Sequence, residues 1–505
     1  MSITAAAAAE RTTFHAEQAR RRRGAWLWGL LCLALAAGIG AVLSTITGPL
    51  LLLLLALALK ALAWLGLAPG AMLRALHGLE GWVAGNLREV FRGLDLLDAV
   101  HGPAGLLAAL GTMATGAALL LPGMAAAVLV WASLARTYRR SAILAATADL
   151  GAREPRPQDP EERQLGNILA EVSLAAGLAT PRLLLLDAPQ PNAAAFGASH
   201  REAAVMATRG LLDRLDRRET QGVVAHLVAA IGDGDLRLAA SVQAVFGTLG
   251  AMVLVFDLPF RRGAWAALRD LLLAIAGLLP PERAERLKAG LAACTAPESL
   301  EGMTRALSLG ERWPPLGALL VMPLLPWTFI TLAQKMLVWL WTLFVFGWPL
   351  GLLWRTRRYL ADAGAVRLLR DPEALAGALR RIDADGLPPG GASQELGFFH
   401  APQQAEKAGF RAQASIVTSV TPPIGKRLWR LSALGAGAAP PQGWRATWQG
   451  LMRVPGWKRW LLVFLLALLV PLLALLVLCV GTLMVGASLF SLAGGASLAA
   501  LILSL

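Results

Sequence analysis

The stretch VVAHLVAAIGDGD, which begins at Val223, has the spacing of a metal-binding helix but lacks most of the side chains that such a helix needs. In the pattern His-Glu-x-x-His, two imidazoles one helical turn apart bind zinc, and the Glu takes a proton from the metal-bound water. Here His226 occupies the first His position, Leu227 the Glu position and Ala230 the second His position. The stretch therefore offers one potential ligand and no general base.

Other side chains do not restore this ligand set. His200 and His400 lie in polar parts of the chain like His226, and neither has a partner at ligand spacing. Asp233 and Asp235 follow His226 by about two helical turns or more, which is too far to replace Ala230. We therefore expect no cofactor here, and zinc only if an unrecognised set of ligands has replaced the missing ones.

The composition is that of an integral membrane protein. Of the 505 residues, 56% are hydrophobic and only 16% are charged, and the mean hydropathy is +0.56, which exceeds that of ordinary soluble proteins. The net charge of +14 is assigned to cytoplasmic loops and to anionic lipid headgroups, since no nucleic-acid motif accompanies it. The lipid bilayer is thus the expected partner, and nucleic acid is not. The three cysteines lie far apart, so no disulfide framework is expected.

Apolar and polar segments alternate along the chain, and a membrane span needs about 20 apolar residues. The polar part has mixed patterns: residues 182–187 and 203–208 are typical of strands, and Glu162 to Ala176 of a helix. These patterns predict a multi-span α-helical membrane protein with an α+β soluble domain. The expected segments are a basic cytoplasmic N-terminus (1–24), an N-terminal membrane region with an amphipathic segment (25–135), the first part of the soluble domain (136–237), a span (238–256), a charged helical insertion (257–315), a further membrane segment or segments (316–354), the second part of the soluble domain (355–458) and a C-terminal membrane hairpin (459–505).

Four collinear blocks, at residues 165–197, 205–238, 355–382 and 419–431, make a family resemblance specific. Together they resemble the membrane zinc metalloproteases of the HtpX and CAAX-prenyl-protease type. The resemblance implies a gluzincin-like, metalloprotease-like fold for the soluble domain. It does not extend to the N-terminal 150 residues, the insertion or the C-terminal hairpin.

The resemblance also implies roles for single positions, and this chain departs from the family at the chemical ones. His226 matches the first zinc ligand, whereas the Glu expected as third ligand is replaced by Arg358. The family's Thr-His-Pro-Pro is Val420-Thr421-Pro422-Pro423 here. A fixed positive charge at position 358 would repel a dication. The chain is therefore expected to be a degenerate member that lacks the complete zinc motif.

Several side chains have two open interpretations. Arg358 either holds a peptide carbonyl or carboxylate where the metal would be, or forms a salt bridge with Asp362 or Asp235. His226 is either a remaining ligand or a partly buried histidine bonded to a backbone carbonyl. The resemblance places Asn192 and Phe196 at the peptide cleft, although both residues are also suited to packing a turn. The residues expected to form the peptide cleft are Asn192, Phe196, Arg209, His226, Arg358 and Asp362.

The strand at 203–208 suggests how a protein of this kind holds peptide, because an added strand pairs through backbone hydrogen bonds and needs no metal. We therefore expect a catalytically inactive homologue in the bacterial inner membrane, with its soluble domain in the cytoplasm. Its expected partners are membrane or unfolded protein segments, or an active protease. The alternatives are an active zinc endopeptidase of membrane protein quality control with relocated ligands, and a structural component of a membrane assembly.

Overall fold

The computed structural model describes four continuous segments, residues 121–148, 150–295, 348–382 and 424–437, together with isolated positions elsewhere such as Phe399. The chain divides into two compact units. One comprises Met1–Cys32 and Trp131–Arg453, and the other comprises Leu33–Val130 and Val454–Leu505. Two predicted segments lie outside the described residues: the basic N-terminus (1–24) and the C-terminal membrane hairpin (459–505). Most of the predicted membrane regions at 25–135 and 316–354 lies outside them as well.

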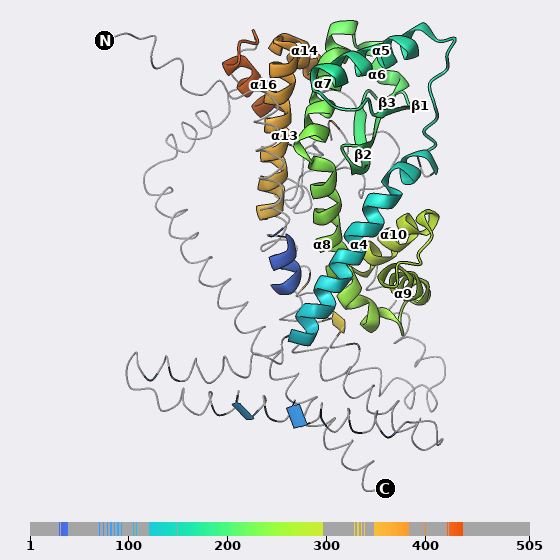
Figure 1. Cartoon of the computed structure of the whole chain (residues 1–505), viewed down its shortest axis with the longest axis vertical. Helices are drawn as coiled ribbons and strands as arrows, with labels where there is room; N and C mark the ends of the chain where they lie inside the picture. Colours follow the sequence, from blue (N-terminus) through green and yellow to red (C-terminus); the bar gives the residue numbers. More distant parts are fainter. Residues whose placement is uncertain are drawn as a thin grey trace, which may run out of the picture. The chain divides into compact units, whose positions relative to one another are not determined.

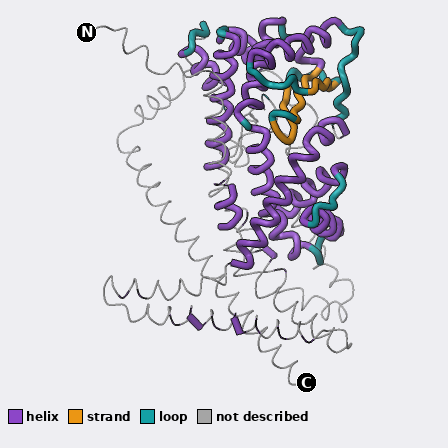
Figure 2. Tube along the Cα trace, viewed as in Figure 1, coloured by secondary structure: helices purple, strands orange, loops and turns teal. Residues whose placement is uncertain are grey.

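A three-stranded sheet lies among the helices of the polar domain (Figure 2). Its strands are β1 (Arg182–Leu186), β2 (Ala193–Ser199) and β3 (Glu202–Thr208), in the order β1-β3-β2. Strand β1 runs parallel to β3, and β2 runs antiparallel to it. The prediction of strands at 182–187 and 203–208 is confirmed. Strand β2 was missed because its sequence, AAAFGAS, is poor in the β-branched residues that favour strands.

The position of β3 corrects one expectation. The strand at 203–208 was expected to offer an edge to peptide, but it is the central strand and is paired on both sides. The outer strands are β1 and β2, and β1 also forms a bridge with Arg153. Strand β2 is the other outer strand, and near its start the carbonyl of Ala193 accepts from the N–H of Phe399.

Helix α7 (Arg217–Asp233) is the central helix of the domain and contains His226. A capping box fixes its start, because the carboxylate of Asp216 accepts from the backbone N–H of Glu219 and the Glu219 side chain accepts in return. The predicted helix at Glu162 to Ala176 is confirmed as α5 (Pro160–Ala175), which packs against α7.

Three further helices, α13 (Trp348–Leu369), α14 (Pro372–Ile382) and α16 (Ile424–Ala433), complete the domain (Figure 1). Helices α13 and α14 pack directly on α7, and α16 packs on both of them. The shared core contains Val223, Leu227 and Leu375. Residues far apart in the sequence are thereby brought to the middle of α7.

Helix α7 continues into α8 (Asp235–Asp257) through Gly234, whose φ of 87° is in the left-handed region that favours glycine. Among the described residues, α8 is the one helix long and apolar enough to cross a membrane, by length and composition alone. Buried residues make up 61% of its most apolar window, a property that core helices of soluble proteins share. The helix contains the predicted span at 238–256.

The predicted insertion is helical where it is described. It forms α9 (Arg262–Ile275), a short 3-10 turn (Pro281–Arg283) and α10 (Ala284–Thr295), which pack on one another and on α8. The predicted boundaries at 135 and 354 fall inside the continuous helices α4 (Leu121–Ala148) and α13. A change from apolar to polar composition does not have to interrupt a helix, so these boundaries mark composition and not structural elements.

Candidate functional site

His226 lies in the middle of α7, completely buried. Its Nδ1 is 2.8 Å from Oδ1 of Asp362 on α13. Burial lowers the pKa of His226 to about 4, although the Asp362 carboxylate acts in the opposite direction. The imidazole is therefore neutral at pH 7. Of the two interpretations left open for His226, the histidine bonded to a backbone carbonyl differs from the structure in its partner, which is a carboxylate.

Asp362 joins the neutral His226 to a cation, Arg427 on α16. The guanidinium of Arg427 donates from Nη2 to Oδ1 at 2.6 Å and from Nε to Oδ2 at 2.9 Å, which is a bidentate pair. Burial alone would raise the pKa of Asp362, but the positive charge of Arg427 and the contact with His226 hold it well below its usual range. Three helices are thus linked through one buried carboxylate.

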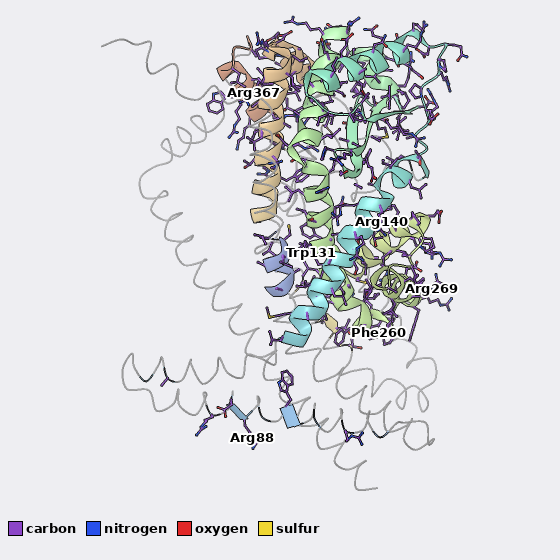
Figure 3. The ribbon with its side chains drawn as sticks, in the orientation of Figure 1. Arg88, Trp131, Arg140, Phe260, Arg269 and Arg367 are labelled. Atoms are coloured by element: carbon purple, nitrogen blue, oxygen red, sulfur yellow. The ribbon has the colours of Figure 1, made fainter. Side chains whose placement is uncertain are left out.

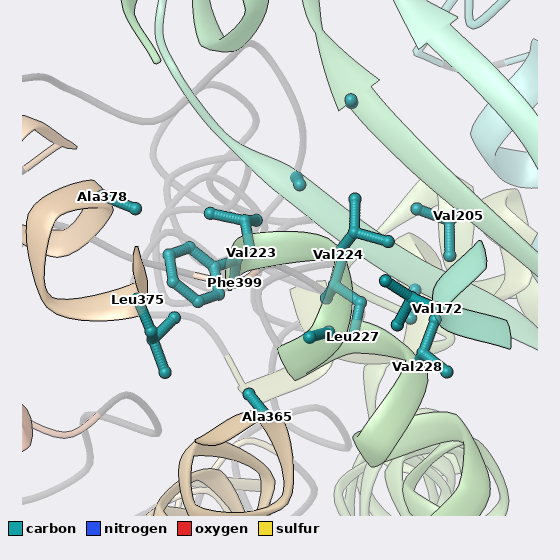
Figure 4. Packing of buried hydrophobic residues seen from close by; sticks show 14 of the residues in the cluster. Val172, Val205, Val223, Val224, Leu227, Val228, Ala365, Leu375, Ala378 and Phe399 are labelled. Atoms are coloured by element: carbon teal, nitrogen blue, oxygen red, sulfur yellow. The ribbon is translucent and has the colours of Figure 1, made fainter. Parts of the chain in front are cut away.

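Phe399 closes this network from another part of the chain. Its ring meets the His226 ring edge-on at a centroid distance of 4.9 Å, and Cζ of Arg427 lies 4.5 Å from the ring centroid. The carbonyl of Phe399 accepts from Nη1 of Arg427 at 3.1 Å, while its N–H donates to the carbonyl of Ala193 on β2 at 2.6 Å. Figure 4 shows the ring beside Val223 and Leu375.

Arg427 and Phe399 are the two site residues that sequence reasoning missed. Arg427 lies in the last of the four blocks, so the resemblance marked its neighbourhood but not its role. Its partner Asp362 is 65 positions away, and an ion pair at that separation has no local pattern. Phe399 follows no motif, and its contacts depend on the packing of α13 against both α7 and α16.

Arg358 lies on α13 one turn before Asp362 and is also buried. Burial and the nearby Arg427 lower its pKa to about 10, while Asp235 and Asp362 act against them. It is therefore still a cation at pH 7. The two carboxylates of the predicted salt bridges have further partners, since Asp235 forms an ion pair with Arg357 (Nε to Oδ1, 2.6 Å) and Asp362 forms one with Arg427.

The two other positions of the incomplete zinc motif are apolar and enclosed. Leu227 is fully buried, and Figure 4 shows it packed with Val224 and Val228 in the core cluster. Ala230 is buried as well. Neither side chain has an atom that can bind a metal or move a proton, so this face of α7 presents His226 alone.

The zinc that the fold family implies does not fit the residues present. The Nδ1 of His226 contacts Asp362, positions 227 and 230 have no donor atoms, and Arg358 brings a positive charge where a third ligand is expected. Within the ranges that the structure describes, no group of three His, Cys, Asp or Glu side chains is arranged to hold a metal ion.

The remaining predicted cleft residues serve the framework. The Oδ1 of Asn192 accepts from the N–H of Ala193 at 2.8 Å, which caps the start of β2. Phe196 packs against the cluster on the sheet face that contains Leu184 and Met206, whereas α7 belongs to the other cluster. Arg209 forms ion pairs with Asp159 and Glu161 at the start of α5, and with Asp213 one turn further along its own helix, α6 (Arg209–Arg214). The structure thus groups His226, Arg358 and Asp362, and places Phe196 and Arg209 elsewhere.

Comparisons with known proteins found one matching family and several similar relatives. The sequence model described as "Peptidase family M48" matches residues 159–434. A "Protease HtpX homolog" of Dictyoglomus thermophilum is 29% identical over 285 residues, which are 56% of this chain and 73% of that protein. One from Listeria monocytogenes is 27% identical over 53% of this chain and 72% of its own length. One from Caldanaerobacter subterraneus reaches 40% identity over 110 residues, 22% of this chain and 36% of that protein. A search of solved structures gave no significant match.

Proposed function

Because this chain belongs to peptidase family M48 and is of the HtpX type, we propose that it is a catalytically inactive member that binds peptide segments at a membrane. The observation that carries the proposal is the surroundings of Leu227. A general base at this position would need water beside it, yet the side chain lies in the apolar core of α7. The side chain at position 227 therefore serves to pack the core.

The replacement of the ligand site supports the same proposal. His226 is held by Asp362 and is neutral, and Arg358 supplies a positive charge. The bidentate pair of Arg427 with Asp362 then connects α13 to α16 beside α7. In this arrangement the polar residues stabilise the domain without a metal, in the place where the resemblance implies a zinc centre.

Strand β2 supports peptide binding. It is an outer strand, and the carbonyl of Ala193 accepts a hydrogen bond from the backbone of Phe399. This contact is of the type that an added strand makes, since backbone groups give affinity and neighbouring side chains give selectivity. The class of ligand that fits is an extended, unfolded stretch of a membrane protein or another protein.

The membrane association rests on composition and on α8. We place the chain in the bacterial inner membrane with the polar domain in the cytoplasm, because the Arg-rich stretch before that domain follows the positive-inside rule. The partners are then the bilayer and exposed protein segments, or an active protease that the chain regulates. In this proposal the net charge of +14 interacts with anionic lipid headgroups and not with nucleic acid.

The first test measures zinc in the purified full-length chain by elemental mass spectrometry after dialysis against a weak chelator. We expect zinc well below one ion per chain, and no hydrolysis of an unfolded protein such as reduced, carboxymethylated lactalbumin. A second preparation carries Leu227→Glu, Ala230→His and Arg358→Glu together and should gain zinc, whereas Ala230→His alone should not. Near-stoichiometric zinc in the wild type that is lost in His226→Ala would contradict the proposal.

The second test measures peptide capture. A photo-reactive amino acid at Ser199, at the end of β2, should cross-link the same unfolded protein. The same group at Leu174 on α5, whose side chain is exposed, is the matched control. Equal cross-linking at both positions would mean non-specific contact and would count against a peptide site on β2.

A further inference from the structure

Helix α9 exposes large apolar side chains on one face. The relative exposure is 62% for Trp265 and 57% for Leu272, which are two helical turns apart and therefore on the same face. Leu278, just after the helix, is 71% exposed. Single exposed leucines are common, but three large apolar residues within a short segment mark an interaction surface. These three residues are called the apolar stripe below.

The opposite face of α9 is fixed in place by close packing. Ala264, Ala267 and Leu271 are buried, and α9 packs on both α10 and α8. A Cβ added at Gly290 of α10 would lie 3.0 Å from the Cβ of Ala267, so the two helices approach closely there. The helix therefore cannot rotate to bury the apolar stripe without losing this contact.

A cluster of arginines lies next to the stripe. The carboxylate of Asp270 is buried and accepts from Arg286 at 2.8 Å and from Arg269 at 3.1 Å, and Arg283 lies 3.9 Å away. The three arginine side chains are each about half exposed. Glu282 and Glu285 add two carboxylates to Asp270, but residues 261–288 contain six Lys and Arg against three Asp and Glu, so this surface is positively charged beside its apolar stripe.

The direction of α9 suits a membrane interface better than a span. In Figure 1, α8 runs along the vertical axis while α9 is seen nearly end-on, so the two helices lie crosswise. The 14 residues of α9 extend only about 21 Å, short of the roughly 30 Å hydrocarbon core. Figure 3 shows Phe260 near the lower end of α8 and Arg269 on the outer side of α9.

We propose that α9 lies in the interface of a membrane with anionic phospholipids. The apolar stripe enters the boundary between headgroups and acyl chains, and Arg269, Arg283 and Arg286 contact lipid phosphates. Exposed Trp and Leu beside Arg form the pattern of helices that lie in this plane. The inference rests on the membrane association proposed above, but not on the loss of hydrolysis or on peptide binding.

The experiment places a fluorescent probe on the stripe in the full-length chain. Cys32, Cys294 and Cys479 are replaced by Ser, and Leu272→Cys is labelled with the polarity-sensitive dye NBD. The matched control is Leu174→Cys on α5, where an equally apolar residue is 82% exposed in the soluble domain. Both proteins are reconstituted into phosphatidylcholine vesicles with or without phosphatidylglycerol, and quenching is measured with lipid-attached nitroxide and with aqueous iodide.

We expect nitroxide to quench the probe at 272 several-fold more strongly than the probe at 174, and iodide to show the reverse order. Omitting phosphatidylglycerol, or introducing Arg269→Gln with Arg283→Gln, should reduce the nitroxide effect. Iodide quenching at 272 as strong as at 174 would overturn the proposal, and so would protection from both quenchers, which would indicate coverage by protein. Vesicle flotation is measured in parallel, because a chain that fails to float would contradict the membrane association itself.

Discussion

Asp362 holds two partners at once, and its carboxylate is the negative charge that the guanidinium of Arg427 contacts in the buried network. A buried ion pair is not by itself a large source of stability, because both groups lose water. Removing one partner lowers the free energy of unfolding strongly, because the other charge then remains buried without its opposite charge. The site is therefore most sensitive to changes that alter one member only.

Asp362→Asn should lower the free energy of unfolding by about 3 to 5 kcal/mol, because Arg427 then remains buried without a carboxylate. The control is Asp213→Asn, which breaks the ion pair with Arg209 at 2.9 Å but lies at an exposed position. That change should cost less than about 1 kcal/mol. Thermal unfolding of both purified variants measures the difference, and equal losses would contradict a buried network at Asp362.

The imidazole of His226 predicts a loss of stability in acid. Its pKa in the folded state is about 4, below its ordinary value of 6.5, so the unfolded chain binds the proton more tightly. The neutral imidazole of His226 therefore makes its full contribution to the free energy of unfolding above pH 6.5. This contribution is lost as the pH falls through 4. The full loss is about 3 kcal/mol.

Unfolding midpoints between pH 7.5 and about 4 test this prediction, with His226→Gln as the control that cannot titrate. Because the pKa of Asp362 is well below its usual range, that carboxylate remains ionised through this window. The wild type should therefore lose more stability on acidification than the variant. Parallel curves for the two proteins would show that His226 does not titrate as described.

At the scale of elements, the site depends on how closely α14 approaches α7. Gly222 permits this approach, since a Cβ there would lie 2.7 Å from the backbone nitrogen of Leu375. The three nearest atoms, in Leu375 and Ala374, are all backbone atoms of a packed helix and cannot move aside without a large energetic cost. The separation of α7 and α14 is thus set by one glycine.

Gly222→Ala should destabilise the domain by about 1 to 3 kcal/mol, the typical cost of overpacking a core. The matched control is Gly166→Ala on α5, where the added methyl would be 3.8 Å from Leu183 in ordinary contact. That change should stabilise the helix by about 0.5 to 1 kcal/mol, because alanine loses less backbone entropy than glycine. Denaturant unfolding of the two variants should therefore move in opposite directions.

At the scale of the whole molecule, α8 is either a helix that crosses the membrane or a buried helix of the protein core. Arg237 lies near its start, and Phe260 follows its end. If α8 crosses a bilayer, its two ends face different compartments. If it is a core helix, both ends are reached from the same side.

Single cysteines at these two positions, in a chain without its three native cysteines, test the crossing. We expect a membrane-impermeant maleimide to label Arg237→Cys only from the cytoplasmic side of sealed vesicles and Phe260→Cys only from the opposite side. Disrupting the vesicles with detergent should make both reactive, which controls for burial. Labelling of both positions from one side would rule out the crossing.

The family membership was accessible from the sequence alone, because four blocks in a fixed order carry more information than any single motif. The strands at 182–187 and 203–208 and the helix at Glu162 to Ala176 were accessible for a related reason. Apolar periodicity is a local property of the chain. The sequence also shows Leu227, Ala230 and Arg358 at the positions where the resemblance implies zinc-motif residues.

Tertiary structure decided which partners these residues have. Sequence spacing indicated Asp362 and Asp235 as neighbours of Arg358, but only the packing of α13 on α7 and of α16 on α13 brings Asp362 to His226 and Arg427 and brings Asp235 to Arg357. The central place of β3 was likewise undetermined until β2 paired with it. An ion pair or a strand pairing forms between residues that the fold brings together, and its energy depends on burial, which no local pattern specifies.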